Sequence, residues 1–410
     1  MNFVKLLISA SSAIFVAAAL ASPSRAAEGS INEPVPTTRT TDVDLGVAVA
    51  YDSNVARSDR ALAARRGLTL ADEITTPSFD FTVARPVGRI VLFVKSDGNY
   101  DFHAINTRRD HLNLDFRGGA GGHFGPCQES LIGDYGQTQS DLADLAQGVT
   151  SNTRVNEDVK FTGACGRAIG LGPGFGVTYS WVDNSAAALR PVNTRSLIVD
   201  ASLAYRQPVL GSISVFGQYV STSYPSRFTL PSGQSIGSGI DIYTGGLRYE
   251  RHIGTRFDTT LAVSYTALYP SSGGSGFRGL TYSLDAAYNL TTRLKFHGSA
   301  ERQTAPSNRV FADYKLDETY DVDVSYTLSS RLTVKASGEI MSSNYRGAHL
   351  NALGVDLTKE TLYTTMASAS YDLTKRLSVV LSAGDVERRA NFPGLSYSST
   401  KVTLGFKAKF

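Results

Sequence analysis

Apolar and polar residues alternate along most of this chain, so that every second side chain within a segment is apolar. Residues 320–326, for example, read Tyr-Asp-Val-Asp-Val-Ser-Tyr. Successive side chains of a β-strand point to opposite faces, so this period of two predicts strands with one apolar and one polar face. About eighteen such segments follow one another between residues 42 and 410, which predicts an all-β fold.

A seven-residue turn motif, Tyr-x-Leu-polar-polar-Arg-Leu, occurs three times, at residues 288–294, 326–332 and 371–377. Polar residues between two alternating segments predict tight hairpins. Such short turns alternate along the chain with longer connections. The longer connections are predicted near residues 52–76, 101–110, 138–155, 221–238, 268–277, 302–313, 342–358 and 386–395. This asymmetry is typical of outer-membrane barrels, which have short periplasmic turns and long outer loops.

The predicted fold class is therefore all-β, a transmembrane antiparallel up-and-down β-barrel of about 18 strands, with 16 strands as the alternative count. The apolar face has to meet lipid because the opposite face carries charge. Closing the sheet also removes the unpaired edges that hydrocarbon does not tolerate. The alternative is a soluble sandwich, which would not need the alternation of short and long connections.

Three regions are predicted along the chain. Residues 1–26 have a basic residue, an apolar run and then small residues, which predicts a signal peptide cleaved after Ala21 or Ala26. A short membrane anchor is the alternative. Residues 27–41 are polar and contain two prolines, which predicts a flexible periplasmic lead, and residues 42–410 are predicted to form the barrel in the cell outer membrane.

The charged residues of both signs lie on the polar face of the predicted strands. Removing residues 1–26 takes away Lys5 and Arg25 and leaves a net charge of 38 − 37 = +1, so no electrostatic argument for a nucleic-acid partner survives. Mixed charges on the inner face imply a water-filled lumen, which is wide enough for a channel at about 18 strands. The residues predicted to face the lumen are Asp115, Arg117, Asp158, Lys160, Arg248, Asp285, Lys295, Glu301, Asp321, Asp323, Lys335 and Glu339.

Within that set, Asp321 and Asp323 could form a local cation site, with ordinary solvated carboxylates as the alternative. No metal, cofactor or catalytic residue is expected, because the six histidines lack metal-pair spacing and no nucleophile elbow or phosphate loop occurs in context. If the barrel were an enzyme, its candidates would be the outer residues His103 or His111 with Asp101 or Asp110.

Aromatic residues mark the ends of several predicted strands. Five tyrosines precede short turns and are predicted to form a girdle at the level of the lipid headgroups: Tyr205, Tyr249, Tyr288, Tyr326 and Tyr371. The final residue, Phe410, ends an amphipathic strand and resembles the signal that barrel-assembly machinery recognises. Lipid of the outer membrane and that machinery are therefore the expected partners.

The two cysteines are predicted to form a disulfide, with two free thiols as the alternative. Cys127 begins one predicted strand and Cys165 ends the next, so both lie at periplasmic ends of neighbouring strands. Two outer loops have helical character and could narrow the pore. These are residues 140–148 and residues 57–72, the second with Arg60, Arg65 and Arg66 as a basic rim; solvated surface loops are the alternative.

The turn motifs at 288–294, 326–332 and 371–377 are similar to turns in the putative β-barrel porin family of proteobacterial outer membranes, which the mature chain resembles. The resemblance implies a porin-like channel that passes solutes or polymer. Because members often lie near exopolysaccharide export genes, it also implies an outer conduit for exopolysaccharide, with export proteins as partners. The alternative is a structural or adhesive barrel plugged by its loops.

Overall fold

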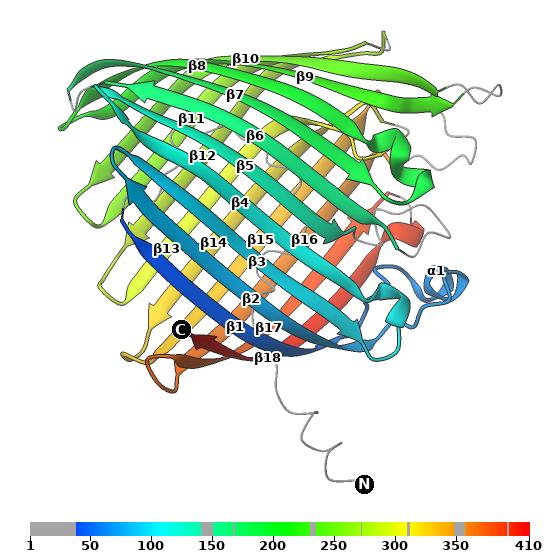
Figure 1. Ribbon diagram of the computed structural model, residues 1–410. Coiled ribbons are helices and arrows are strands. Elements are labelled where there is room, and N and C mark those ends of the chain that lie inside the picture. The colour runs from blue at the N-terminus through cyan, green and yellow to red at the C-terminus, as the bar shows by residue number, and fades with distance from the viewer. Residues whose placement is uncertain are drawn as a thin grey trace.

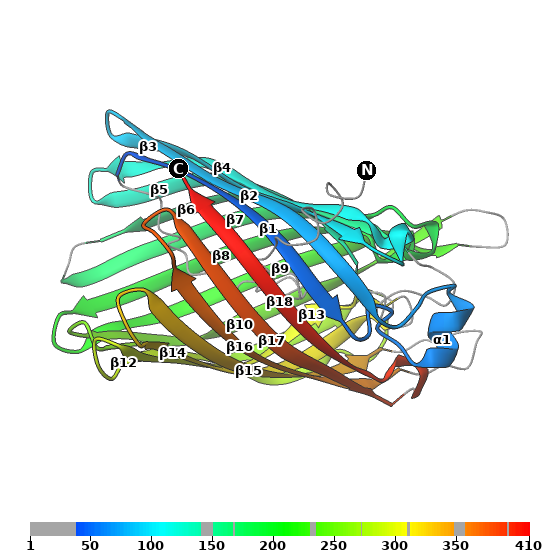
Figure 2. The same cartoon turned by 90° about the horizontal axis from the view of Figure 1, so that it is seen from below.

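The computed structural model describes residues 38–140, 151–166, 169–229, 235–271, 273–309, 312–347, 357–391 and 393–410. These residues contain eighteen strands in one antiparallel sheet (Figure 1). Each strand pairs with the next one along the chain, and β1 (Thr40–Asp52) also pairs with β18 (Tyr397–Lys409). Figure 2 shows these two strands, in blue and red, side by side where the barrel closes. The predicted fold class is confirmed.

The other strands follow in order. They are β2 (Asp72–Val87), β3 (Ile90–His103), β4 (His111–Phe124), β5 (Cys127–Gln139), β6 (Thr153–Cys165), β7 (Gly170–Asn184), β8 (Thr194–Gln207), β9 (Gly211–Thr229), β10 (Ser235–Ile253), β11 (Phe257–Pro270), β12 (Phe277–Asn289), β13 (Leu294–Pro306), β14 (Tyr314–Thr327), β15 (Leu332–Arg346), β16 (Lys359–Asp372) and β17 (Leu377–Ala390). The first strand starts at Thr40 rather than at residue 42, because Thr40–Val43 pair with β2.

Short helices occur only between strands in the described ranges. They are α1 (Arg60–Arg65) and the 3₁₀ helices η1 (Thr107–Arg109), η3 (Ala187–Val192) and η4 (Pro393–Leu395). In the part of the chain that the structure describes, no helix is both long and apolar enough to cross a membrane. All four lie in the longer connections, which gather at one end of the barrel, whereas the tight turns lie at the other end (Figure 1).

The repeated turn motif has a common hydrogen-bond pattern. Its fourth residue, a serine or threonine, accepts a bond from the backbone N–H of the final leucine: Thr291 from Leu294 at 2.9 Å, Ser329 from Leu332 at 3.1 Å and Thr374 from Leu377 at 3.0 Å. The carbonyl of the motif's arginine accepts a bond from the next hairpin; for Arg293 the donor is the backbone N–H of Thr327. The motif thus closes each hairpin and links it to its neighbour.

The connection predicted at residues 221–238 is wrong in extent. Strand β9 continues to Thr229 and β10 starts at Ser235, and the ladder still pairs Tyr224 with Ser238. Polar residues in this stretch hid the strand, because polar side chains on both faces are tolerated where a strand projects beyond hydrocarbon. A further outer connection, at residues 185–193, contains η3 and was missing from the predicted set.

The barrel has an apolar outer face and a polar inner face. Side chains of the apolar set remain exposed, as for Val322 (57%) and Leu404 (45%). In the register, apolar residues lie opposite apolar residues across successive strands, as in the pairing of Leu261 with Leu284. Lipid covers such a belt, and the alternate residues therefore line the interior.

A disulfide joins Cys127 of β5 to Cys165 of β6, with an Sγ–Sγ distance of 2.07 Å. The two residues are direct cross-strand partners at the tight-turn ends of these strands. The pair therefore ties β5 and β6 together at these ends, as the sequence predicted.

We expect titration of the unfolded, unreduced protein with a thiol reagent to detect no free thiol, because both cysteines of the chain are in this bond. After reduction the same titration should detect two thiols per chain. Intact mass after alkylation measures both states. Two reactive thiols before reduction would contradict the disulfide.

Candidate functional site in the barrel lumen

The lumen wall carries charges of both signs in direct cross-strand register. Arg117 of β4 lies opposite Asp134 of β5, which lies opposite Asp158 of β6. The Nε atom of Arg117 is 3.5 Å from Oδ1 of Asp134. Arg117 and Asp134 have opposite charges and partly compensate each other, whereas Asp134 and Asp158 have the same charge. Charged side chains that stay partly exposed to the interior require water there.

The twelve residues predicted to face the lumen lie on the polar face of their strands. Their cross-strand partners differ in kind: some are charged, some are polar and some are apolar. Arg248 is buried, with its guanidinium 4.9 Å from the centre of the Phe216 ring. Lys295 and Lys335 both lie opposite Ser325. Two carboxylates lie opposite another carboxylate, Glu339 opposite Asp321 and Asp115 opposite Asp97. Two other charged residues lie between uncharged partners: Lys160 between Ile132 and Thr178, and Glu301 between Ser283 and Thr319.

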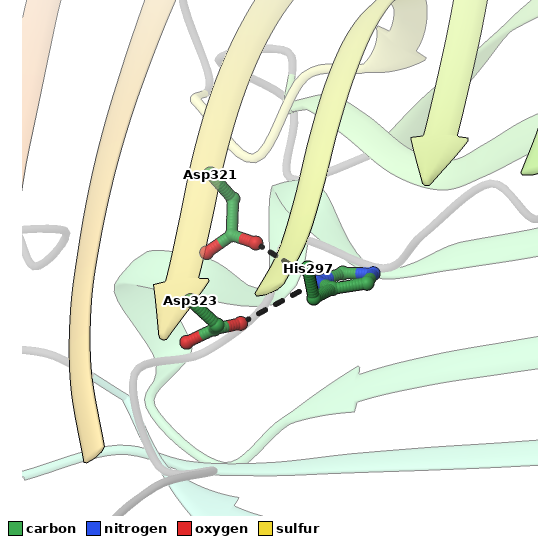
Figure 3. A group of neighbouring side chains, drawn as sticks. All are labelled: His297, Asp321 and Asp323. Carbon is green, nitrogen blue, oxygen red and sulfur yellow. Dashed lines mark ion pairs between the residues drawn. The ribbon is translucent and has the colours of Figure 1, made fainter. Parts of the chain in front are cut away.

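Three of the predicted residues, Asp285, Asp321 and Asp323, meet around one histidine, His297 of β13. Figure 3 shows this histidine with Asp321 and Asp323. Its Nε2 atom is 2.8 Å from Oδ2 of Asp285 on β12. Its Nδ1 atom is 3.6 Å from Oδ1 of Asp321 and 3.5 Å from Oδ2 of Asp323, both on β14. His297 was not among the predicted site residues, although its polar-face position in β13 could have indicated it.

At the outer mouth, described residues of the connection between β13 and β14 are bonded to β9. We call the described residues of this connection, 307–309 and 312–313, the strap. The Tyr224 hydroxyl of β9 donates to the Ser307 carbonyl at 3.1 Å. The Arg227 guanidinium, also on β9, donates to the carbonyls of Arg309, at 2.9 Å, and Ala312. Because β9 is not a neighbour of β13 or β14 in the sheet, these bonds bring the strap inward.

The strap is also held from the other side. The Nη2 atom of Arg309 is 3.8 Å from Oε2 of Glu360 on β16, and the same carboxylate receives bonds from Arg388 of β17 and from the Tyr345 hydroxyl of β15. All four side chains are largely buried. An ion-pair network of this kind, shielded from solvent, restrains a loop more strongly than surface pairs do.

Apolar side chains fill part of the outer lumen beside the strap. Tyr314, the first residue of β14, packs with Val220, Ile240, Ile242 and Leu268 of β9–β11. These residues are on the inner face of their strands, where the sequence led us to expect polar residues lining a water-filled space. The sequence around these residues does not show that they are buried inside the barrel, because the side chain that covers them, Tyr314, comes from a distant segment of the chain.

The first outer connection is ordered as well. Its predicted helical segment, 57–72, contains α1, whose N-cap Asp59 accepts a bond from the backbone N–H of Leu62 at 2.7 Å. This part of the prediction is confirmed. Of the three arginines predicted to form a basic rim, Arg60 and Arg65 are exposed. The prediction is wrong for Arg66, whose side chain is buried and donates to the Ala56 carbonyl at 3.4 Å.

An apolar contact joins the first outer connection to a distant one. Ala56, Ala63 and Leu68 pack against Leu189 and Val192 of η3, which lies between β7 and β8. The outer mouth is therefore narrowed by two separate contacts, this one and the strap. The other segment predicted to narrow the pore, 140–148, lies outside the described residues except for Ser140.

The histidines considered as enzyme candidates sit at the outer ends of β3 and β4. His103 Nδ1 is 3.4 Å from Oδ1 of Asp110, and His111 Nε2 is 3.4 Å from Oδ2 of Asp101. Thr76 also donates to Asp101, at 2.6 Å. The carboxylate of Asp110 accepts its bond from the backbone N–H of His103, at 2.7 Å, rather than from the ring. The Nδ1 atom of His111 lies 2.7 Å from the Arg109 carbonyl, so both histidines belong to a partly buried set of polar contacts at this corner of the mouth.

The five girdle tyrosines lie within the last five residues of β8, β10, β12, β14 and β16, near tight turns and on the apolar face of the sheet. Phe410 follows β18 at the same end, where its backbone N–H donates to the Val43 carbonyl at 2.9 Å, and its side chain is exposed. Their proposed roles, at the headgroup level and in barrel assembly, stay predictions.

A closed eighteen-stranded barrel with an apolar outer belt, a charged lumen and long loops at one end is an outer-membrane barrel of the porin-like class. Residues 278–410 match the protein family described as "Putative beta-barrel porin 2". This stretch contains all three copies of the turn motif, so the resemblance expected from those turns is confirmed there.

Solved structures of outer-membrane proteins match this chain at low sequence identity. The siderophore receptor PirA from Acinetobacter baumannii is 8% identical, with 92% of this chain and 81% of that chain covered and a TM-score of 0.47. OccAB4 from A. baumannii is 11% identical, with 92% and 100% covered and a TM-score of 0.46. OccK2 (OpdF) from Pseudomonas aeruginosa is 9% identical, with 90% and 98% covered and a TM-score of 0.47. No curated protein matches the sequence.

Proposed function

We propose that this barrel is a channel for small hydrophilic solutes, narrowed at its outer mouth by the strap. The observation that carries the proposal is the lumen wall, where ionisable side chains of both signs line the inner face of a closed barrel. Ionisable groups inside a membrane protein are stable where opposite charges pair or where water solvates them, and those of the lumen wall stay partly exposed. The balance of signs supports a channel without strong charge selectivity.

Passage of a polysaccharide chain is a narrower form of this proposal, and only the resemblance of the turn motifs supports it. A polymer would have to thread the outer mouth. There the strap is bonded to β9 on one side and to Glu360 of β16 on the other. These contacts would have to open for each chain, whereas a small solute can pass beside them.

Single-channel recording of the refolded mature protein in a planar bilayer tests the proposal. We expect steady conductance steps, and we expect liposomes containing the protein to swell in small sugars but not in dextrans. Swelling in dextrans would favour the polymer conduit.

A structural or adhesive barrel is the second candidate, because the outer connections pack on one another across the mouth. Absence of conductance, both in the native protein and in a variant whose strap is released, would overturn the channel and favour this candidate. Conductance that appears only in the released variant would support a channel that the strap closes.

A further inference from the structure

We propose that His297, Asp321 and Asp323 bind a divalent first-row transition-metal cation on the lumen wall. The cluster lies near the tight-turn end of the barrel. His297 of β13 and Asp323 of β14 are direct cross-strand partners, so the register of these two strands sets the spacing of the ligands. The proposal goes beyond solute passage, and it stands whether or not the lumen conducts. Within the described residues, these three donors are a group whose ligand atoms all lie within 4.8 Å of one another.

The distances fit ligands that share an ion better than ligands that bond to each other. Nδ1 of His297 is 3.6 Å and 3.5 Å from the nearest oxygens of Asp321 and Asp323. Direct N–H···O bonds are about 2.7–3.2 Å long. Ligands placed about 2.1 Å from a tetrahedral zinc ion lie roughly 3.4 Å apart, which is close to the observed spacing.

The fourth residue of the cluster orients the histidine. Nε2 of His297 lies 2.8 Å from Asp285, so this nitrogen is placed to donate its proton to a carboxylate. A neutral imidazole that donates from Nε2 has its lone pair on Nδ1, the atom that faces Asp321 and Asp323 (Figure 3). Histidines that bind metal characteristically donate their other ring nitrogen to a carboxylate in this way.

The donor types select the class of cation. One imidazole and two carboxylates suit zinc, nickel or cobalt, whereas calcium and magnesium prefer oxygen ligands alone. The side chains of His297 and Asp323 remain 39% and 51% exposed, so water in the lumen can fill further coordination positions. The site is therefore open on one side and would exchange its ion with the lumen.

Isothermal titration calorimetry of the refolded protein in detergent, with Zn²⁺ or Ni²⁺ as the probe, tests the proposal. We expect saturable binding of one ion per chain in the native protein. His297→Ala should abolish it. Asp285→Asn should weaken it by roughly 10- to 100-fold, because the carboxylate only orients the histidine. Co²⁺ absorption in the visible range provides a second readout of the same ligands.

The chain supplies a matched control in His252 of β10, which lies 2.8 Å from Asp258 at the same end of the barrel. His252→Ala removes a histidine–carboxylate pair and should leave binding unchanged. Heat-dependent migration on a gel verifies that each variant is folded. Absence of binding in the native protein, or equal binding in the His297→Ala variant, would overturn the proposal and leave a simple ion pair between histidine and carboxylates.

Discussion

Arg227→Gln is expected to increase the conductance of the barrel and to make it fluctuate. Arg227 is 2% exposed and donates to two carbonyls of the strap, those of Arg309 and Ala312. A shortened neutral side chain cannot maintain both bonds. Loss of hydrogen bonds from a charged group costs about 1.5–3 kcal/mol, which shifts the strap toward an undocked state by roughly 10- to 100-fold.

Single-channel recording in planar bilayers measures this shift as larger steps and as transitions between two levels. Tyr224→Phe, which removes the bond to the Ser307 carbonyl, should act in the same direction with a smaller effect. The matched control is Arg251→Gln at the tight-turn end of β10, where the guanidinium contacts only the Tyr249 hydroxyl among its described hydrogen bonds. Native conductance in both the Arg227→Gln and the Tyr224→Phe variants would show that the strap does not restrict the lumen.

Val263→Arg is expected to destabilise the barrel strongly. Val263 lies near the middle of β11, is 47% exposed and pairs with Leu247 and Tyr282 on the apolar face. An arginine at the bilayer midplane of a barrel costs about 2–4 kcal/mol of folding free energy. The side chain has no water within reach at that depth, and the neighbouring outward residues provide no opposite charge.

Thr260→Arg is the control on the same strand. Thr260 is on the inner face, opposite Glu250 and Asp285, so an arginine there meets water and carboxylates. It should change the unfolding free energy by a small amount. Reversible urea unfolding in lipid vesicles measures both variants. Equal destabilisation by the two substitutions would contradict the assignment of the apolar face to lipid.

Much of the barrel follows from local information. Alternation such as Tyr320, Val322 and Val324 against Asp321 and Asp323 specifies which side chains share a face, because the period of a strand is two. The polar residues of the turn motif specify where hairpins close, as the bond from Leu332 to Ser329 shows. The predictions failed where local rules weaken, as in β9 and β10, whose outer ends lack the apolar face that hydrocarbon requires.

The candidate site was predicted less completely. Asp285, Asp321 and Asp323 were correctly assigned to the inner face. Their spacing along the chain did not indicate that they would surround His297, because the four residues lie on three strands, β12, β13 and β14, whose relative register brings them together. The strap was missed for a similar reason. Arg227 is 82 residues away from Arg309 in the chain, and neither residue has a local pattern that points to the other.

The sequence by itself determined the class of fold, the two faces of the wall, the tight-turn end and the positions of the cysteines. Each of these depends on residues within one strand, one turn or one pair of neighbouring strands. Only the tertiary structure decided that the strap reaches β9 and β16, that α1 and η3 meet over the mouth, and that His297 gathers three carboxylates. Those contacts form when closure of the sheet brings segments that are distant in sequence around one lumen. The alternation of apolar and polar residues does not indicate which distant segments will meet.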